Sequence, residues 1–193
     1  MPVFTKRALV DAFGKVLMKK PFKKITISDI TDECGISRMT FYYHFKDIHA
    51  LVEWTLEVSL KDAIKGNFTY ETWKQGFLNV FYFALERKEV ILKIYPEFEK
   101  RYLEDYLHKI AVRLTIGVID EKAVGLNINE HDKYFMADIC AYALVGVLIS
   151  WVKNNMEEDP VDVVEKFSCI FKDMLINSLI RLSAPESVKL LKE

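Results

Sequence analysis

The sequence has few residues that interrupt helices. It contains only seven Gly and five Pro among 193 residues. Because Gly and Pro most often end helices and form tight turns, their scarcity favours helices over a turn-rich β architecture. A disordered chain is also excluded, since 51% of the residues are hydrophobic and 28% are charged. We therefore expect an all-α globular protein.

Cysteine is scarce as well. Cys34, Cys140 and Cys169 are odd in number, lie far apart and form no Cys-x-x-Cys pair. This spacing indicates neither a disulfide framework nor a zinc site. We expect all three to be small, buried, apolar side chains in the reducing cytoplasm.

Long apolar runs and an N-terminal targeting segment are missing. Lys6, Arg7 and Asp11 interrupt any apolar core that a signal peptide would need. The longest apolar stretch, Ile139 to Val152, is shorter than the roughly 20 residues of a membrane-spanning helix. We therefore expect a cytoplasmic protein that does not enter a membrane.

Motifs of common enzyme classes are also missing. We find no Gly-x-Gly-x-x-Gly, P-loop, His-Glu-x-x-His or Gly-x-Ser-x-Gly pattern. The four histidines contain no pair four residues apart that would hold a metal on a helix: His44, His49, His108 and His131. The sequence therefore predicts no catalytic residue, no metal and no cofactor.

The overall formal charge of −1 conceals an uneven distribution. Residues 1–50 hold nine basic and five acidic residues, a charge of +4, whereas the remainder holds 18 and 23, a charge of −5. A basic N-terminal region on an acidic body suggests that only the N-terminal region meets a polyanion.

Residues 27–45 have the pattern of two short helices joined by a glycine. Ser28, followed by acidic residues, predicts the start of the first helix. Gly35 would end it in a left-handed conformation, and Ser37 would cap a second helix that runs to Phe45. A helix-turn-helix needs a small shared core, which these side chains can supply: Ile30, Cys34, Ile36, Phe41 and Phe45.

The second of these helices has an inner and an outer face. At about 100° per residue, Phe41 and Phe45 share the inner face. The opposite face, which would enter a DNA major groove, carries Met39, Thr40 and Tyr43. The flanks, where phosphates would pass, carry Tyr42 and His44. Arg38 lies in the first turn, from which recognition helices contact bases or phosphates.

This segment resembles the TetR/AcrR family of transcriptional regulators. The resemblance lies in Gly35-Ile36-Ser37 and in the run from Thr40 to Phe45, and it is strong over about residues 5–55. It implies about nine helices: an N-terminal three-helix DNA-binding domain, then a helical ligand-binding and dimerisation domain. It also implies a homodimer that reads a palindromic operator in double-stranded DNA.

The resemblance implies two sets of DNA contacts. Phosphate contacts would come from Thr26, Ser28, Tyr42 and His44. Base contacts would come from Arg38, Met39, Thr40 and Tyr43. Ser37 and Lys46 complete the predicted set. One position departs from the family pattern, because Ile48 stands where a lysine usually binds a phosphate. Lys46 or the N-terminus of the following helix would then have to make that phosphate contact.

We expect the DNA-binding domain over residues 1–48, a connecting helix over about 47–65, and the second domain over 66–193. The second domain would dimerise through its last two helices, as the resemblance implies. The apolar residues predicted at that interface are Leu144, Leu148, Trp151, Val164, Phe167, Phe171, Met174 and Leu175. The alternative is that these residues form the core of a monomer.

Aromatic side chains with polar tips predict an effector pocket in the second domain. The candidates are Trp73, Phe77, Tyr82, Tyr95, Tyr102, Tyr106, His108 and Tyr134. The alternative is that these residues are ordinary core, because aromatic residues at helical spacing often are.

The effector class stays open between a small molecule and a protein. The ending Trp151-Val152-Lys153-Asn154 and the turn at Pro160 are similar to a subgroup that includes an activator of dihydroxyacetone-kinase genes, which implies a protein co-regulator. A further alternative is a protein-binding adaptor, or a co-regulator-dependent activator, with weak DNA affinity of its own.

Overall fold

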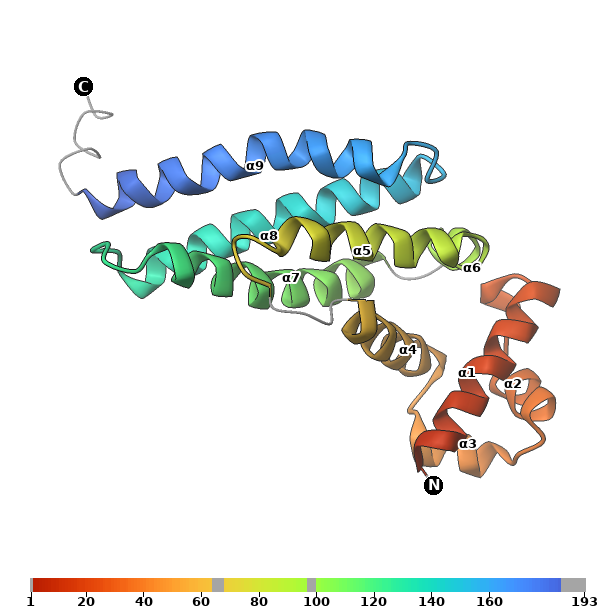
Figure 1. The fold of residues 1–193 in the computed structure, drawn as a ribbon. Coiled ribbons are helices and arrows are strands. Elements are labelled where there is room, and N and C mark those ends of the chain that lie inside the picture. Colours follow the sequence, from red (N-terminus) through yellow and green to blue (C-terminus); the bar gives the residue numbers. More distant parts are fainter. Residues whose placement is uncertain (1, 64–67, 97–99, 185–193) are drawn as a thin grey trace. The chain divides into compact units, whose positions relative to one another are not determined.

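A computed structural model describes residues 2–63, 68–96 and 100–184. All regular structure in these ranges is helical (Figure 1). The elements are α1 Pro2–Lys19, a 3₁₀ turn Phe22–Lys24, α2 Ile27–Cys34, α3 Arg38–His44, α4 Ile48–Ala63, α5 Trp73–Glu86, α6 Lys88–Ile94, α7 Lys100–Lys122, α8 Glu130–Lys153 and α9 Pro160–Ser183. The prediction of an all-α fold of about nine helices is confirmed for this part of the chain.

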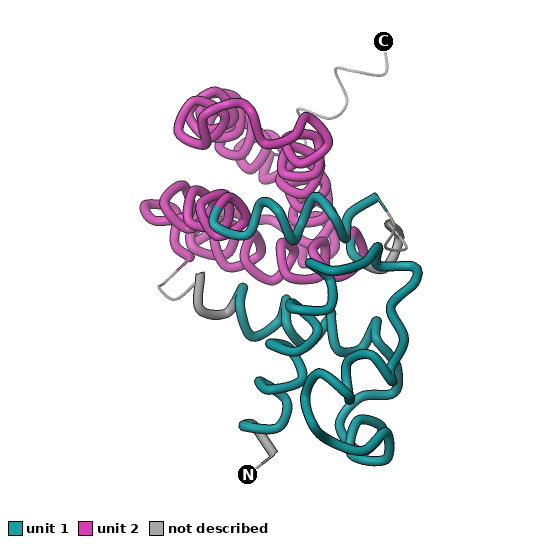
Figure 2. Tube along the Cα trace, turned by 90° about the vertical axis from the view of Figure 1, so that its right-hand side faces the viewer, with its two compact units in different colours: residues 1–62, 86–103 teal, residues 63–85, 104–193 magenta. Residues whose placement is uncertain are grey.

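The chain divides into two compact units (Figure 2). The first unit comprises residues 1–62 and 86–103, and the second comprises residues 63–85 and 104–193. Helix α6, predicted to belong to the second domain, lies in the first unit. Its residues Val90 and Ile94 pack against the core of that unit.

The core of the first unit is built on one face of α1. Leu9, Phe13 and Leu17 recur at four-residue spacing and are buried against Ile30 of α2 and Phe41 of α3. This spacing places one side chain above another on the same side of a helix. Truncating a buried Phe to Ala costs about 3–5 kcal/mol, so these contacts dominate the stability of the unit.

The N-terminus of α2 differs from its prediction. Thr26, not Ser28, is the capping residue, and its side chain accepts a hydrogen bond from the Asp29 amide. The Asp29 carboxylate accepts the return bond from the Thr26 amide. If Ser28 were the cap, the third residue of the helix would be Thr31, which has no carboxylate to make such a bond. The predicted cap of the next helix is confirmed, since Ser37 accepts from the Thr40 amide at 3.2 Å.

The second unit is held together by aromatic contacts. Trp73 of α5 lies 5.0 Å from Phe171 of α9, and Phe81 of α5 lies 4.8 Å from Trp151 of α8, measured between ring centroids. Helices α8 and α9 run in opposite directions (Figure 1). The Trp151 indole N–H donates to the Glu158 carbonyl at 2.7 Å, which ties the end of α8 to the turn before α9.

Helix α8 is longer than the apolar stretch in its sequence. It has 24 residues and is long and apolar enough to cross a membrane by length and composition alone. The expectation that this segment is too short is therefore wrong. Half of its most apolar 18-residue window is buried, as in a core helix of a folded domain.

The three cysteines occupy three different environments. Cys140 is buried, Cys34 is partly buried and Cys169 is exposed. The expectation that all three are buried is wrong for Cys169, because it lies on the outer side of α9 next to the exposed Ile170.

Candidate DNA-binding surface

The turn between α2 and α3 takes three residues. Gly35 has a φ of 72°, in the left-handed region, and its amide donates to the carbonyls that end α2. The Ile36 amide donates to the Thr31 carbonyl at 3.0 Å. A left-handed residue followed by this longer hydrogen bond closes a helix and turns the chain sharply. Helix α3 therefore starts at once in a new direction, as a helix-turn-helix requires.

Helix α3 is held from behind by two phenylalanines. Phe41 and Phe45 are buried, and their ring centroids lie 5.9 Å apart. On the outer side, Met39 is 79% exposed and Tyr43 is 82% exposed. A seven-residue helix thus presents two large side chains to solvent instead of burying them. This is the arrangement that the pattern of residues 37–45 predicted.

The flanks of α3 carry further aromatic groups. Tyr42 is 48% exposed, and its ring meets Phe41 at 5.9 Å with an interplanar angle of 88°. His44 is partly buried and meets the Tyr43 ring at 5.0 Å, also edge to face. Both flanking rings are therefore oriented by neighbours on the same helix.

Hydroxyl groups lie at the N-termini of α2 and α3. The Ser37 and Thr40 hydroxyl oxygens are 3.0 Å apart, so each orients the other. The Thr26 hydroxyl donates to the Asp29 carboxylate at 2.6 Å, so a phosphate would have to compete with that bond. Ser28 is partly buried in the first turn of α2.

The acids of α2 pair with lysines in the second half of α1 and directly after it. Glu33 pairs with Lys19 at 2.6 Å and Lys15 at 3.8 Å, and Asp29 pairs with Lys20. The hydrogen bond from Lys20, aided by Thr26, lowers the pKa of Asp29 to about 2. The hydrogen bond from Lys19 likewise lowers the pKa of Glu33.

The cations beside α3 are not neutralised in this way. Arg38 and Lys46 are exposed, and within the described ranges no carboxylate lies at salt-bridge distance from either. Ile48, at the departure from the family pattern, packs partly buried against the core of the first unit. The positive charge that remains available thus flanks the exposed face of α3.

Comparison with known proteins agrees with this geometry. A family model described as "Bacterial regulatory proteins, tetR family" matches residues 6–54. A second, described as "Transcriptional regulator C-terminal region", matches residues 71–173. The chain belongs to the TetR family of transcriptional regulators. It is a DNA-binding regulator and not an enzyme, so both of these predictions are confirmed.

Individual relatives are similar in sequence, and one solved structure is similar in fold. The chain is 26% identical over 146 residues to the HTH-type dhaKLM operon transcriptional activator DhaS of Lactococcus lactis subsp. lactis (strain IL1403), covering 75% of this chain and 76% of that protein. It is 26% identical over 161 residues to the uncharacterised HTH-type transcriptional regulator YvkB of Bacillus subtilis (strain 168), covering 72% and 80%. A solved structure of the dihydroxyacetone kinase operon activator DhaS matches in fold with a TM-score of 0.65 at 19% identity, over 94% of this chain and 99% of that one.

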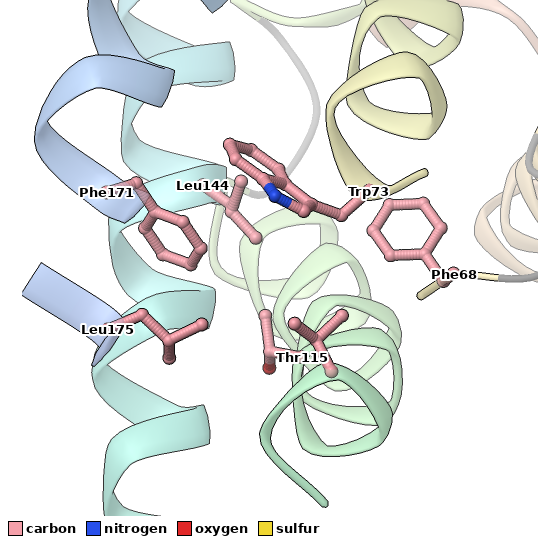
Figure 3. Close-up of a pocket in the computed structure, with 7 residues that line it drawn as sticks. Phe68, Trp73, Thr115, Leu144, Phe171 and Leu175 are labelled. Carbon is pink, nitrogen blue, oxygen red and sulfur yellow. The ribbon is translucent and has the colours of Figure 1, made fainter. Parts of the chain in front are cut away.

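In the part of the chain that the structure describes, no cavity is lined by more than one of the predicted effector residues. Trp73 borders a narrow apolar cavity in the second unit (Figure 3). The cavity is lined by Phe68, Trp73, Thr115, Val118, Leu144, Phe171 and Leu175. Of these residues, only Trp73 was predicted from the sequence to line a pocket. Apolar positions on α7, α8 and α9 show no sequence pattern that distinguishes a residue lining a cavity from a residue of the solid core.

The other predicted effector residues are dispersed. Phe77 is buried between Phe81 and Phe167, with ring centroids 5.0 and 5.5 Å away. Tyr82 and Tyr134 are exposed. Tyr106 is partly buried on α7, Tyr95 is buried in the first unit, and the side chain of Tyr102 lies outside the described residues.

His108 lies in a different place from Trp73, in a groove between α7 and α8. The groove has a volume of about 370 Å³. The imidazole ring lies against the Tyr142 ring at a centroid distance of 4.1 Å, with the two planes tilted by 34°. Its Nε2 lies 3.1 Å from a carboxylate oxygen of Asp138.

Most of the predicted dimer residues are buried within the second unit itself. The six buried ones are Leu144, Leu148, Trp151, Val164, Phe171 and Leu175. Phe167 is partly buried, and only Met174 is exposed. Other apolar side chains of α8 and α9 also face solvent: Phe135, Ile139 and Tyr142 on α8, and Ile170 and Ile180 on α9.

Proposed function

We propose that this TetR-family regulator acts in the cytoplasm as a homodimer on a palindromic operator, and that a small molecule or protein acting on its second unit controls it. The observation that carries the DNA-binding part is the exposed face of α3, where Met39 and Tyr43 stand in solvent between unpaired cations. A chain that used α3 only as core would bury these side chains.

We assign two roles to the residues of this surface. Arg38, Met39, Thr40 and Tyr43 contact base edges in the major groove, since they share the outer face or first turn of α3. Thr26, Ser28, Ser37, Tyr42, His44 and Lys46 contact phosphates and set the position of α3 in the groove.

The DNA-binding proposal is tested by selecting bound sequences from a random pool and titrating the enriched site against salt. A regulator should enrich a palindrome and lose affinity steeply as salt rises. Replacing Arg38 with Gln should weaken binding by about 1–3 kcal/mol. Lys74→Gln, which removes a cation paired with Glu165 in the second unit, is the matched control. An adaptor that binds only protein would show little affinity and no salt slope.

We infer that the dimer forms through the exposed apolar side chains of α8 and α9. Phe135 is 60% exposed and Ile170 is 71% exposed, and surfaces of this kind are covered in stable oligomers. Two DNA-binding units about one helical turn of DNA apart, or a multiple of it, would then read the two half-sites. Most of the interface residues predicted from the sequence are buried, and they would pack beneath the exposed side chains of α8 and α9.

The oligomeric state tests this interface directly. Ile170→Glu should convert the dimer into a monomer in sedimentation equilibrium, because an unpaired charge would be buried at the contact. Tyr82→Glu, at an exposed aromatic residue of α5, should leave the dimer intact. A parent protein that sediments as a monomer would contradict the proposal.

The cavity beside Trp73 supports control by an uncharged, apolar small molecule. Among the described residues, no charged side chain lines it, and the Thr115 hydroxyl donates to carbonyls of its own helix and of Ala137. Its free volume is about 10 Å³, close to the room that one water needs, so an effector has to displace Trp73 or Phe68. Val118→Ile adds a single methyl group to the cavity wall, which should narrow the cavity further and weaken a small-molecule response while operator binding persists. Control by a protein partner would survive that change.

A further inference from the structure

Lys6 lies near the start of α1 with its ammonium group over two aromatic rings. Its Nζ is 5.2 Å from the ring centroid of Phe45 and 5.2 Å from that of Trp54. The two rings meet each other at 5.9 Å. Contact with ring faces attracts a cation without neutralising its charge. The ammonium is therefore restrained in position and still fully positive.

The position of Lys6 is set by the end of the recognition helix. The Phe45 amide donates to the Phe41 carbonyl at 2.9 Å and closes α3. A cation over the Phe45 ring thus lies near the C-terminal end of α3. Within the first unit, Figure 1 shows the N-terminal end of α1 beside α3, away from the C-terminal end of α1.

Lys6 also differs in charge pairing from other lysines of its helix. Lys15 and Lys19 pair with Glu33. Among the residues that the structure describes, no carboxylate lies within salt-bridge distance of Lys6. One end of α1 is thus neutralised by α2, and the other keeps a restrained cation at the α3 surface.

We propose that Lys6 binds a backbone phosphate of DNA at the end of α3, with Phe45 and Trp54 as the residues that position it. The proposal rests on the proposed DNA-binding function. It assigns to α1 a phosphate contact that Ile48 of α4 cannot make, because that side chain is apolar and packs against the core. Phosphodiester oxygens are the matching ligand for a restrained ammonium.

The test is Lys6→Gln, measured on the selected operator across about 50 to 200 mM salt. One lost phosphate contact should reduce the slope of log K against log salt by about 0.9, and weaken binding about eightfold near 0.1 M salt. Sequence preference should not change. Lys15→Gln removes the same charge from the same helix and should leave the slope close to that of the parent.

Two further variants separate a phosphate contact from a change in folding. Ile48→Lys in the Lys6→Gln background should restore the slope, since it places a cation at the start of α4. Trp54→Leu should weaken binding in the parent but have no additional effect on binding in the Lys6→Gln background. Thermal unfolding of each variant shows whether it is folded.

The outcomes distinguish this proposal from the DNA-binding proposal. If the parent binds DNA with a salt slope and Lys6→Gln keeps that slope, or if Lys15→Gln lowers it equally, the role of Lys6 is overturned while the regulator function stands. If the parent shows no salt-dependent binding to any DNA, both proposals are overturned.

Discussion

Thr26 and Asp29 cap each other at the start of α2. The Thr26 hydroxyl oxygen accepts from the Asp29 amide at 3.2 Å, and the Asp29 carboxylate accepts from the Thr26 amide at 2.7 Å. The same carboxylate pairs with Lys20, which follows α1 directly. One pair of residues thus fixes where α2 begins and ties it to the end of α1.

Thr26→Ala should destabilise the protein by about 1 kcal/mol, the usual cost of losing a side-chain cap. Ser28→Ala should cost much less, because Ser28 does not cap α2 in this structure. Denaturant unfolding of the two variants provides the measurement. Equal losses for both, or a larger loss for Ser28→Ala, would show that the cap is assigned to the wrong residue.

The cap also predicts a response to acid. Asp29 has its pKa lowered from 3.8 to about 2, chiefly by Lys20 and then by Thr26. The stability that its carboxylate contributes is therefore complete above about pH 4 and lost as the pH falls through about 2. Carboxyl NMR of the folded protein should show Asp29 titrating well below an ordinary aspartate. Asp29→Asn should remove that part of the acid dependence; an Asp29 that titrates normally would contradict the assignment.

Two glycines of the first unit should respond to alanine in opposite directions. Gly35 has a φ of 72° and Gly14 lies inside α1, and an added Cβ meets no atom within 4 Å at either position. Gly35→Ala should cost about 1 kcal/mol, from backbone strain alone. Gly14→Ala should stabilise the protein by about 0.5–1 kcal/mol, since Gly is a poor helix former. Unfolding curves of the two variants and the parent protein show whether each substitution raises or lowers the free energy of unfolding.

The three cysteines should react with a maleimide in a fixed order. Cys169 is exposed in a single chain and should react first in the monomeric Ile170→Glu variant, in which the proposed dimer contact cannot cover it. Burial and the charge of Asp11 raise the pKa of Cys34, which should react more slowly. Burial raises the pKa of Cys140 to about 12, so it should react only after unfolding. Peptide mass mapping over time gives the order, and early labelling of Cys140 would mean that α8 is not packed as described.

The two adjacent tyrosines of α3 should affect DNA binding differently. Tyr43→Ala should alter sequence preference, because Tyr43 stands on the outer face. Tyr42→Phe should weaken binding about evenly across sequences, since only a hydroxyl on the flank is removed. Binding to a panel of operator variants separates the two effects. If both changes leave binding unaltered, α3 is not the element that reads DNA.

The helix-turn-helix could be predicted from the sequence because its determinants are local. Gly35 requires its left-handed backbone whatever surrounds it, and Ser37 caps the helix that it precedes. Phe41 and Phe45, four residues apart, define the buried side of α3 and therefore its exposed side. These residues lie within about ten positions of one another. The sequence pattern was therefore enough to predict the turn and the exposed face of α3.

Three features could be known only from the tertiary structure: the buried side of α8, the cavity around Trp73 and the contacts of Lys6. Helix α8 is apolar on most sides, so periodicity does not separate the residues facing the core, such as Leu144, from those facing outward, such as Ile139. The same holds for the narrow cavity around Trp73, since its walls come from four helices and the segment before α5. Lys6 carried no local signal at all, because its two aromatic partners are distant in the sequence. Contacts between segments that are distant in the sequence depend on how the helices pack. The periodic spacing of apolar residues does not reveal which helices pack together or which of their residues meet.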